Sequence, residues 1–287
     1  MRRPGKTSLS TALLPLLAGP AWVWPLSQAQ AQAQAQAQER SLPPVTVPSA
    51  RGPAAVEKSY RRMVSAVELF ERERAAMAPQ ATLRFKLLPR KPGVSVDDVD
   101  LNILGRSVVV PVAVAPDRTF VLPRNDRALD ENAIVTPDRI ARTMTWRAEV
   151  RTPGLPTGVR RLGDLRLECY VGMEAGLISE KPSLVGRLVQ RLTDSPAYCD
   201  SRGNRYIFFA ERPLFGVTLE SGERREVLPA ARLWAGAVGD ASLREDLPYC
   251  DCEVLLDRAY FLPLGDRSWP DDTRVLFDAM VDADAPR

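Results

Sequence analysis

The stretch DRTFVLPRNDRALDENAIV, residues Asp117–Val135, recurs further along the chain as DRAYFLPLGDRSWPDDTRV, residues Asp257–Val275. The two segments align without a gap at an offset of 140 positions, and seven of their nineteen residue pairs are identical. Each copy holds an apolar run that ends in Leu-Pro and is followed by an Asp-Arg pair. Self-similarity at a fixed offset is the signature of a repeated structural unit. We therefore interpret the chain as a candidate tandem duplication.

Short apolar runs with a period of two residues surround both copies. In Thr82–Leu88, for example, Leu83, Phe85 and Leu87 fall on one face. Alternation of this kind, bounded by Pro, Gly, Asn and Asp, predicts short strands. The strands expected in the first unit are Thr82–Leu88, Val99–Leu104, Ser107–Ala115, Thr119–Leu122, Ala133–Val135 and Thr143–Val150. Those expected in the second unit are Tyr206–Ala210, Gly216–Glu220, Glu223–Leu228, Ala231–Ala237, Glu253–Leu256, Ala259–Leu262 and Arg274–Met280. The spacing favours a mainly β fold made of two sandwich-like antiparallel β units.

The run VPVAVAPDRTFVLP, residues Val110–Pro123, resembles the transthyretin-like and carboxypeptidase-regulatory β-sandwiches, in which a strand, an Asp-containing turn and an apolar strand follow one another. The resemblance implies a sandwich for the first unit. Pro111 lies within the run. Because proline cannot donate a ladder hydrogen bond, we expect its strand at a sheet edge or a bulge.

An amphipathic helix is predicted before the first strand. Ala54–Met77 carries apolar residues at three- and four-residue spacing, and Pro79 follows shortly after its end. We expect the apolar face of this helix to cover one face of the sheet that follows.

Between the two units the sequence predicts three consecutive elements. Arg151–Gly163 is rich in Pro and Gly and is predicted to be a connector, and Asp164–Val171 is predicted to be a strand with Leu165, Leu167 and Cys169 on one face. A short helix is predicted at Ser183–Leu192, because its leucines and valines form a stripe after Pro182.

The N-terminus has the residue order of a secretory signal peptide. Arg2, Arg3 and Lys6 precede an apolar region, and small alanines follow it. Cleavage is expected near Ala29–Ala31, which would leave a periplasmic or secreted protein without a transmembrane anchor. The predicted organisation is therefore a signal peptide (1–31), a disordered Ala/Gln and Pro-rich linker (32–53), the helix with the first β unit (54–155), a connector with a helical insert (156–203) and the second β unit (204–287).

The linker contains Leu42–Val47, LPPVTV, which resembles the TonB box near the mature N-terminus of TonB-dependent outer-membrane receptors. The resemblance covers six residues, and the rest of the chain is too short to supply both a plug and a large barrel. We therefore interpret these residues as an extended linker and do not expect a contact with TonB.

Charge and composition exclude several classes of function. Export would remove three basic residues and no acidic one, so the formal charge would fall from +3 to about 0. A neutral protein has no electrostatic attraction for nucleic acids or for anionic membrane surfaces. The chain has no histidine, which excludes Ser-His-Asp and Cys-His mechanisms and histidine-ligated zinc. No cofactor and no metal site are predicted.

Cysteine is limited to Cys169, Cys199, Cys250 and Cys252. In an exported protein an even number of cysteines predicts disulfides before it predicts a metal site. A bond between Cys169 and Cys199 would staple the helical insert. A pairing of either with Cys250 or Cys252 is equally consistent with the sequence, whereas Cys250 with Cys252 is geometrically awkward.

The second copy of the repeat supplies the candidate binding residues. They are Asp266, Arg267, Trp269, Asp271 and Asp272. An exposed Trp beside Arg is typical of interaction hot spots, and oxygen-rich loops can hold Ca²⁺. A tryptophan folded over its own sheet and carboxylates that cap turns are the alternative roles of these residues. The first copy has Leu129 at the position of Trp269.

No nucleophile frame and no phosphate-binding glycine pattern is present, so we predict no catalytic residues. The expected function is a non-catalytic structural or interaction module of the bacterial cell envelope, with an envelope protein or a cell-wall component as partner. One alternative is an envelope hydrolase that works through carboxylates, for which the available residues are Asp97, Asp98, Asp164, Glu168, Asp251 and Glu253. The other is a β-sandwich module that binds Ca²⁺ or another small ligand.

Overall fold

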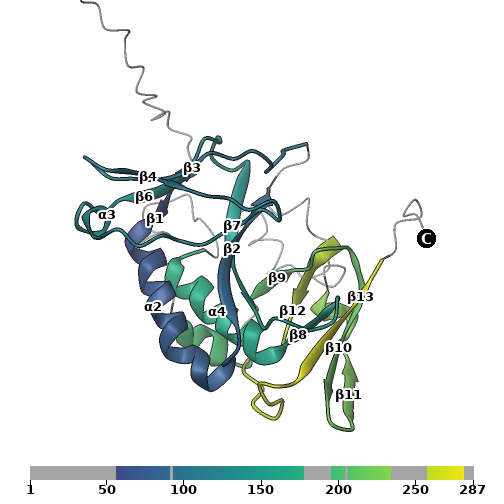
Figure 1. Cartoon of the computed structure of the whole chain (residues 1–287). Helices are drawn as coiled ribbons and strands as arrows, with labels where there is room; N and C mark the ends of the chain where they lie inside the picture. The colour runs from purple at the N-terminus through teal and green to yellow at the C-terminus, as the bar shows by residue number, and fades with distance from the viewer. Residues whose placement is uncertain (1–55, 91–92, 178–194, 204–205, 234–256, 281–287) are drawn as a thin grey trace, which may run out of the picture. The chain divides into compact units, whose positions relative to one another are not determined.

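The computed structural model describes residues 56–90, 93–177, 195–203, 206–233 and 257–280, which all belong to the compact unit Ala50–Arg287 (Figure 1). This part of the chain consists mostly of strands in antiparallel sheets, with few helices. The strands are β1 (Lys58–Ser59), β2 (Thr82–Pro89), β3 (Leu101–Leu104), β4 (Val109–Val112), β5 (Thr119–Phe120), β6 (Ile134–Pro137), β7 (Met144–Arg151), β8 (Val159–Arg161), β9 (Ile207–Phe209), β10 (Leu214–Ser221), β11 (Arg224–Val227), β12 (Ala259–Phe261) and β13 (Arg274–Ala279). The α-helices are α2 (Tyr60–Met77), α3 (Asp126–Asp130) and α4 (Leu162–Ala175).

The described strands form four sheets. Two sheets have four strands, in the orders β1-β6-β3-β4 and β11-β10-β13-β8. A three-stranded sheet has the order β5-β2-β7, and β12 pairs with β9. The prediction for Pro111 is confirmed, because β4 lies at the edge of its sheet. The alternation in Thr82–Leu88 is confirmed as well, since Phe85 and Leu87 of β2 are buried.

Helix α2 begins later than predicted. Lys58 and Ser59 pair with β6 as strand β1, and the Ser59 side chain caps the helix by accepting a hydrogen bond from the backbone N–H of Arg62. We expect the apolar face of α2 to cover the sheet that follows it. In the structure this face lies mainly against α4 instead (Figure 1). The sequence had not indicated a helix at that place.

The predicted strand Asp164–Val171 is wrong, because these residues belong to α4. Twelve of the fourteen residues of α4 are buried. A helix that is enclosed on every side has no polar stripe, and therefore its sequence lacks the 3.6-residue contrast of an amphipathic helix. The alternation of Leu165, Leu167 and Cys169 was misleading for this reason.

Three further segments differ from their predictions. The connector Arg151–Gly163 contains strand β8, which pairs with β13. The loop after Pro123 contains α3, whose N-terminus is capped by the Asn125 side chain. Ala231–Ala237 begins within a short 3₁₀ turn, Ala230–Arg232, and Leu233 makes a single bridge to Tyr260. The signal peptide, the linker with Leu42–Val47, the helix Ser183–Leu192, the strand Glu253–Leu256, and Cys250 and Cys252 lie outside the described residues.

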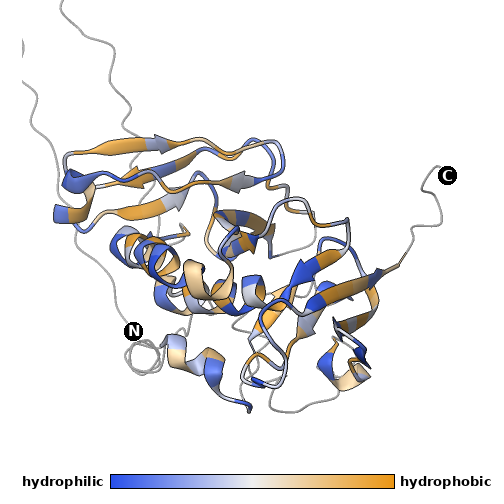
Figure 2. Ribbon diagram, turned by 60° about the horizontal axis from the view of Figure 1, so that its bottom comes forward, coloured by the Kyte–Doolittle hydropathy of each residue, from blue (hydrophilic) through white to orange (hydrophobic). Residues whose placement is uncertain are grey.

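Helix α4 contributes to both hydrophobic cores of the described chain. Leu167, Val171 and Ala175 pack with α2 and with the sheets that contain β2 and β3. The opposite side of the helix, with Leu165 and Cys169, packs with strands β9, β10, β12 and β13. Figure 2 shows hydrophobic sequence on the helices and on the strands around them. Burial on two sides makes α4 the element that joins the two cores.

We expect Leu167→Ala to lower the free energy of unfolding by about 2–5 kcal/mol, because it opens a cavity that surrounding elements cannot easily fill. Urea titration followed by circular dichroism measures this change. Val227→Ala is the matched control, since the Val227 side chain is 61% exposed, and it should change the free energy by no more than about 0.5 kcal/mol. Equal effects of the two substitutions would contradict the central position of α4.

Candidate functional site

Helix α4 carries three buried charged residues, Asp164, Arg166 and Glu168, whose side chains are the starting point for any chemical role. Asp164 and Glu168 are one helical turn apart and lie on the same side, whereas Arg166 points to another side. The two carboxylates make hydrogen bonds to one part of the fold, and Arg166 makes hydrogen bonds to another.

The two carboxylates bind one edge of strand β7 and its continuation. Glu168 Oε2 accepts a hydrogen bond from the backbone N–H of Val150 at 3.0 Å, and Asp164 Oδ2 accepts one from Thr152 at 2.8 Å. Residues two apart in a strand are about 6.7 Å apart, and residues four apart in a helix rise by about 6 Å. One helical turn therefore matches two strand residues, and the carboxylates take the place of a neighbouring strand.

Arg160 completes this arrangement from β8. Its Nη2 donates to the carbonyl oxygen of Val150 at 2.5 Å and to Glu168 Oε2 at 2.6 Å. Both partners of the ion pair are almost fully buried. Burial raises the pKa of the Glu168 carboxyl, and the nearby charge of Arg160 together with the Val150 amide opposes that rise. Glu168 is thus held as a hydrogen-bonded member of the core.

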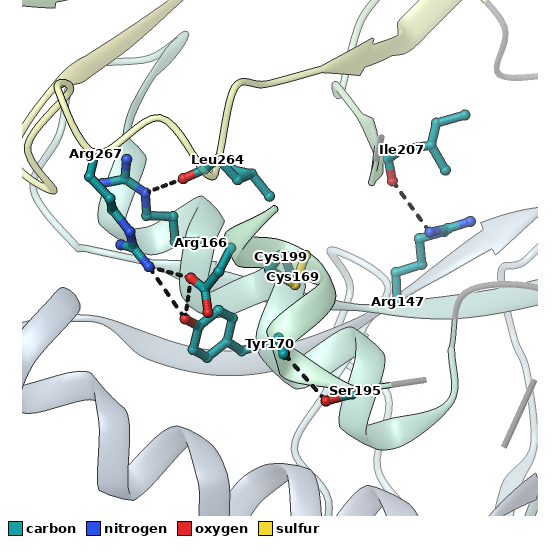
Figure 3. The surroundings of a disulfide bond; sticks show 11 residues. Arg147, Arg166, Cys169, Tyr170, Ser195, Cys199, Ile207, Leu264 and Arg267 are labelled. Carbon is teal, nitrogen blue, oxygen red and sulfur yellow. Dashed lines mark hydrogen bonds and ion pairs between the residues drawn. A yellow bond between two sulfur atoms is a disulfide. The ribbon is translucent and has the colours of Figure 1, made fainter. Parts of the chain in front are cut away.

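Arg166 binds the loop of the second repeat copy. Its guanidinium donates to the carbonyl oxygen of Leu264 at 2.9 Å (Figure 3). It also donates to the carbonyl oxygens of Asp266 and Trp269, each at 2.9 Å, and to Asp271 Oδ1 at 2.5 Å. Asp271, predicted as a binding residue, is therefore the counterion of a buried arginine. Asp266 Oδ1 accepts hydrogen bonds from the backbone and hydroxyl of Ser268, and Asp272 is exposed. These contacts shape the loop.

Trp269 is not exposed, although we had considered it as an interaction hot spot. Its side chain is only 1% exposed and belongs to the core with β10 and β13. The guanidinium of Arg224 lies 3.5 Å from its ring centroid, which is a cation–π contact. The alternative role, a tryptophan folded over its own sheet, is the correct one.

Arg267 joins the loop to α4 and to the 3₁₀ turn Pro196–Asp200. It forms an ion pair with Asp200, and the Tyr170 hydroxyl donates to the same carboxylate oxygen at 2.7 Å (Figure 3). The neighbouring residues, Cys169 and Cys199, form a disulfide with their Cα atoms 6.1 Å apart. Of the pairings that the sequence left open, the structure therefore contains Cys169 with Cys199.

Glu131, an acidic residue of the first repeat copy, also has structural partners. Both oxygens of Glu131 accept hydrogen bonds from Ser107, from its backbone N–H at 2.8 Å and from its hydroxyl. These bonds lower the pKa of Glu131 from its ordinary value of 4.5 to about 2. Within the described ranges, no group of three or more His, Cys, Asp or Glu side chains is arranged to hold a metal ion.

A cleft of about 550 Å³ is lined mainly by residues of β2, β7 and β9. We call it the arginine cleft. Its cationic lining residues are Lys86, Arg118, Arg147, Arg151, Arg160 and Arg258. Its acidic lining residues are Asp117, Glu149, Glu168 and Glu211. The volume lies in the range of small-molecule sites, about 300–1,000 Å³.

Arg147 is the most enclosed cation of the cleft apart from Arg160. Its guanidinium lies 4.8 Å from the centroid of the Phe209 ring and donates to the carbonyl oxygen of Ile207 at 3.3 Å (Figure 3). Burial lowers the pKa of Arg147, and the charge of Arg90 lowers it further. Burial also raises the pKa of Tyr206 in the cleft wall to about 12. The cleft therefore combines cationic groups with aromatic surface.

Sequence reasoning missed this cleft. Glu168 was recognised only as an available carboxylate, and Arg147 and Arg151 were not singled out at all. Arg147 and Phe209 meet from strands more than sixty residues apart in the sequence, and arginine is so abundant in this chain that its positions carry no local signal. None of the five residues predicted for binding from the sequence lines the arginine cleft.

Comparison with known proteins gives no relative: no family model, no curated protein and no solved structure matches this chain. Within the described residues, no helix is both long and apolar enough to span a lipid bilayer.

We expect Glu131→Gln to remove a pH-dependent part of the stability. Because folding lowers the pKa of Glu131 to about 2, its stabilising contribution is fully present above pH 4.5, its ordinary pKa, and is lost as the pH falls through about 2. Urea titrations of both proteins between pH 2 and pH 7 measure the difference. A difference that does not depend on pH would contradict the assignment.

We expect Arg166→Met to lower the free energy of unfolding by about 3–5 kcal/mol, because it leaves Asp271 and three carbonyl oxygens without their donor. Arg225→Met is the control, since Arg225 is an exposed arginine paired with Glu220, and it should cost no more than about 1 kcal/mol. Thermal and urea unfolding measure both. If Arg166→Met is as stable as Arg225→Met, the loop does not depend on Arg166.

Proposed function

We propose that this protein is an exported, non-catalytic interaction module of the bacterial cell envelope. The signal-peptide order of the N-terminus supports export, and the Cys169–Cys199 disulfide is consistent with an oxidising compartment. The partner would be an envelope protein or a cell-wall component.

The observation that carries the non-catalytic role is the use of the buried carboxylates. Glu168 and Asp164 each accept hydrogen bonds from backbone amides of the β7 segment, and Asp271 neutralises Arg166. A general acid or base must be free to exchange its proton with a substrate, whereas these groups are engaged in holding the fold. The cleft, with cationic and aromatic walls, is the surface we assign to the partner.

The two β units remain proposed as sandwich-like copies of one ancestor. The strands of the two repeat segments support this, since β5 and β12 begin at Thr119 and Ala259, and β6 and β13 begin at Ile134 and Arg274, at an offset of 140. Their neighbours differ, because β5 pairs with β2 and β12 pairs with β9. A solved structure in which the two units do not superpose would contradict the duplication.

A carboxylate-dependent envelope hydrolase is the second proposal. It is favoured by three glutamates, Glu149, Glu168 and Glu211, that line one cleft. Glycoside hydrolysis needs two carboxyl groups about 5–10 Å apart. Release of soluble fragments from purified cell wall, abolished by Glu149→Gln in a folded protein, would support this second proposal.

A pull-down from envelope extract tests the interaction module. The mature protein is immobilised and its retained components are compared with those on the same protein after reduction and alkylation under denaturing conditions. We expect at least one component that only the folded protein retains and that free folded protein displaces. If no such component is retained and the protein degrades purified cell wall, the result contradicts the interaction module and favours the hydrolase.

A further inference from the structure

A second, smaller pocket adjoins the arginine cleft. It measures about 210 Å³, and its apolar walls include Phe209, Leu214, Tyr260 and Phe277. We call it the aromatic pocket. The cleft and the pocket share five wall residues, Arg151, Arg160, Phe209, Ala210 and Glu211. A ligand that fills both therefore crosses from a charged region into an apolar one at this shared wall.

The aromatic pocket is suited to a ring or a branched apolar group. The ring of Tyr260 is buried, and Phe277 packs against it with ring centroids 5.0 Å apart. A cavity of about 150 Å³ is enough to bind benzene in a protein interior. Contacts with aromatic edges and faces would hold such a group.

The shared wall presents cations to a ligand in the cleft. The side chain of Arg151 is 40% exposed, and it forms ion pairs with Glu211 at 2.7 Å and with Glu149 at 3.2 Å. Its fork of donors can take a carboxylate in place of one of these partners. In the described chain, Arg160 Nε–H is buried and makes no hydrogen bond. A buried donor without an acceptor is costly, which is a reason to expect an acceptor nearby when the site is filled.

The charges of the cleft also limit the ligand. Four acidic side chains line it beside the six cationic ones. A multiply charged anion such as phosphate would be repelled by these carboxylates. A single negative charge is repelled less by these carboxylates and is still attracted by the small positive excess.

We propose that the arginine cleft and the aromatic pocket together bind a small amphiphilic carboxylate, with its carboxylate at Arg151 and its apolar or aromatic group in the aromatic pocket, against the walls that Tyr260 and Phe277 form. This inference rests on the proposed interaction function and names the chemistry that the partner presents: a carboxylate attached to a compact apolar group.

Isothermal titration of the mature protein tests the site. The probe is N-acetyl-L-phenylalanine, and the matched neutral compound is N-acetyl-L-phenylalanine amide. We expect a dissociation constant below about 1 mM for the acid and binding of the amide weaker by about tenfold or more, because a hydrogen bond to a charged group is lost. Acetate and inorganic phosphate, which lack the apolar group, should bind more weakly than the acid.

Two variants and one control locate the binding. Arg151→Gln should weaken binding of the acid by about tenfold and leave binding of the amide unchanged. Phe277→Leu should weaken binding of both compounds. Arg225→Gln removes an arginine of exposed strand β11 that is paired with Glu220, and it should bind both compounds like the wild type. Melting temperatures confirm that each variant is folded.

Equal binding of acid and amide, or no binding of either, overturns the inference, as does a loss in Arg225→Gln as large as in Arg151→Gln. The envelope pull-down separates this failure from that of the proposed function. A component retained equally by wild type and Arg151→Gln, with no binding of the acid, leaves the interaction function standing and removes the carboxylate site. If the acid binds but the pull-down retains no component, the carboxylate site stands and the interaction function is removed.

Discussion

The structure depends on the burial of α4 between two hydrophobic cores. A helix without a solvent-facing side has no place for a charged residue unless that residue finds a partner inside the protein, because an unpaired buried charge is strongly destabilising. Asp164, Arg166 and Glu168 satisfy this condition by bonding to the β7 segment, to the loop before β13 and to Arg160. The same bonds fix the position of the sheets relative to the helix. The requirement to satisfy three charges thus determines where two distant parts of the chain can lie.

Much of the strand arrangement follows from the sequence. The alternation of Leu83, Phe85 and Leu87 gave β2 its position, and Pro111 placed β4 at an edge. Helix α4 did not follow, because its apolar residues surround the helix and the period-two run around Leu167 resembled a strand. Pairings between strands depend on contacts between residues that are far apart in the sequence. The cysteine positions suggest only one such long-range link that the structure contains, Cys169 with Cys199.

The candidate site was harder to predict than the fold for a related reason. The residues chosen from the repeat, Trp269 and Asp271 among them, carry groups that can bind a partner, but in the structure these groups serve the loop itself. A tryptophan in a turn can fill the core beneath it, and an aspartate can neutralise an arginine that arrives from another element. The cleft draws its residues from β2, β7, β8, β9 and α4, each of which contributes one or a few members. No local pattern records such a convergence.

The links between α4 and the 3₁₀ turn Pro196–Asp200 affect what happens when the chain is cut. Two adjacent pairs hold it: Cys169 with Cys199 by a covalent bond, and Tyr170 with Asp200 by a hydrogen bond. A protease that cut the chain anywhere between these cysteines would leave both fragments attached to each other through the disulfide. The nicked protein would migrate as one species without reductant and as two with it, while α4 stayed joined to the strands on either side of the cut. In a compartment rich in proteases, such a chain would therefore remain one covalently linked molecule after a single cut in its backbone.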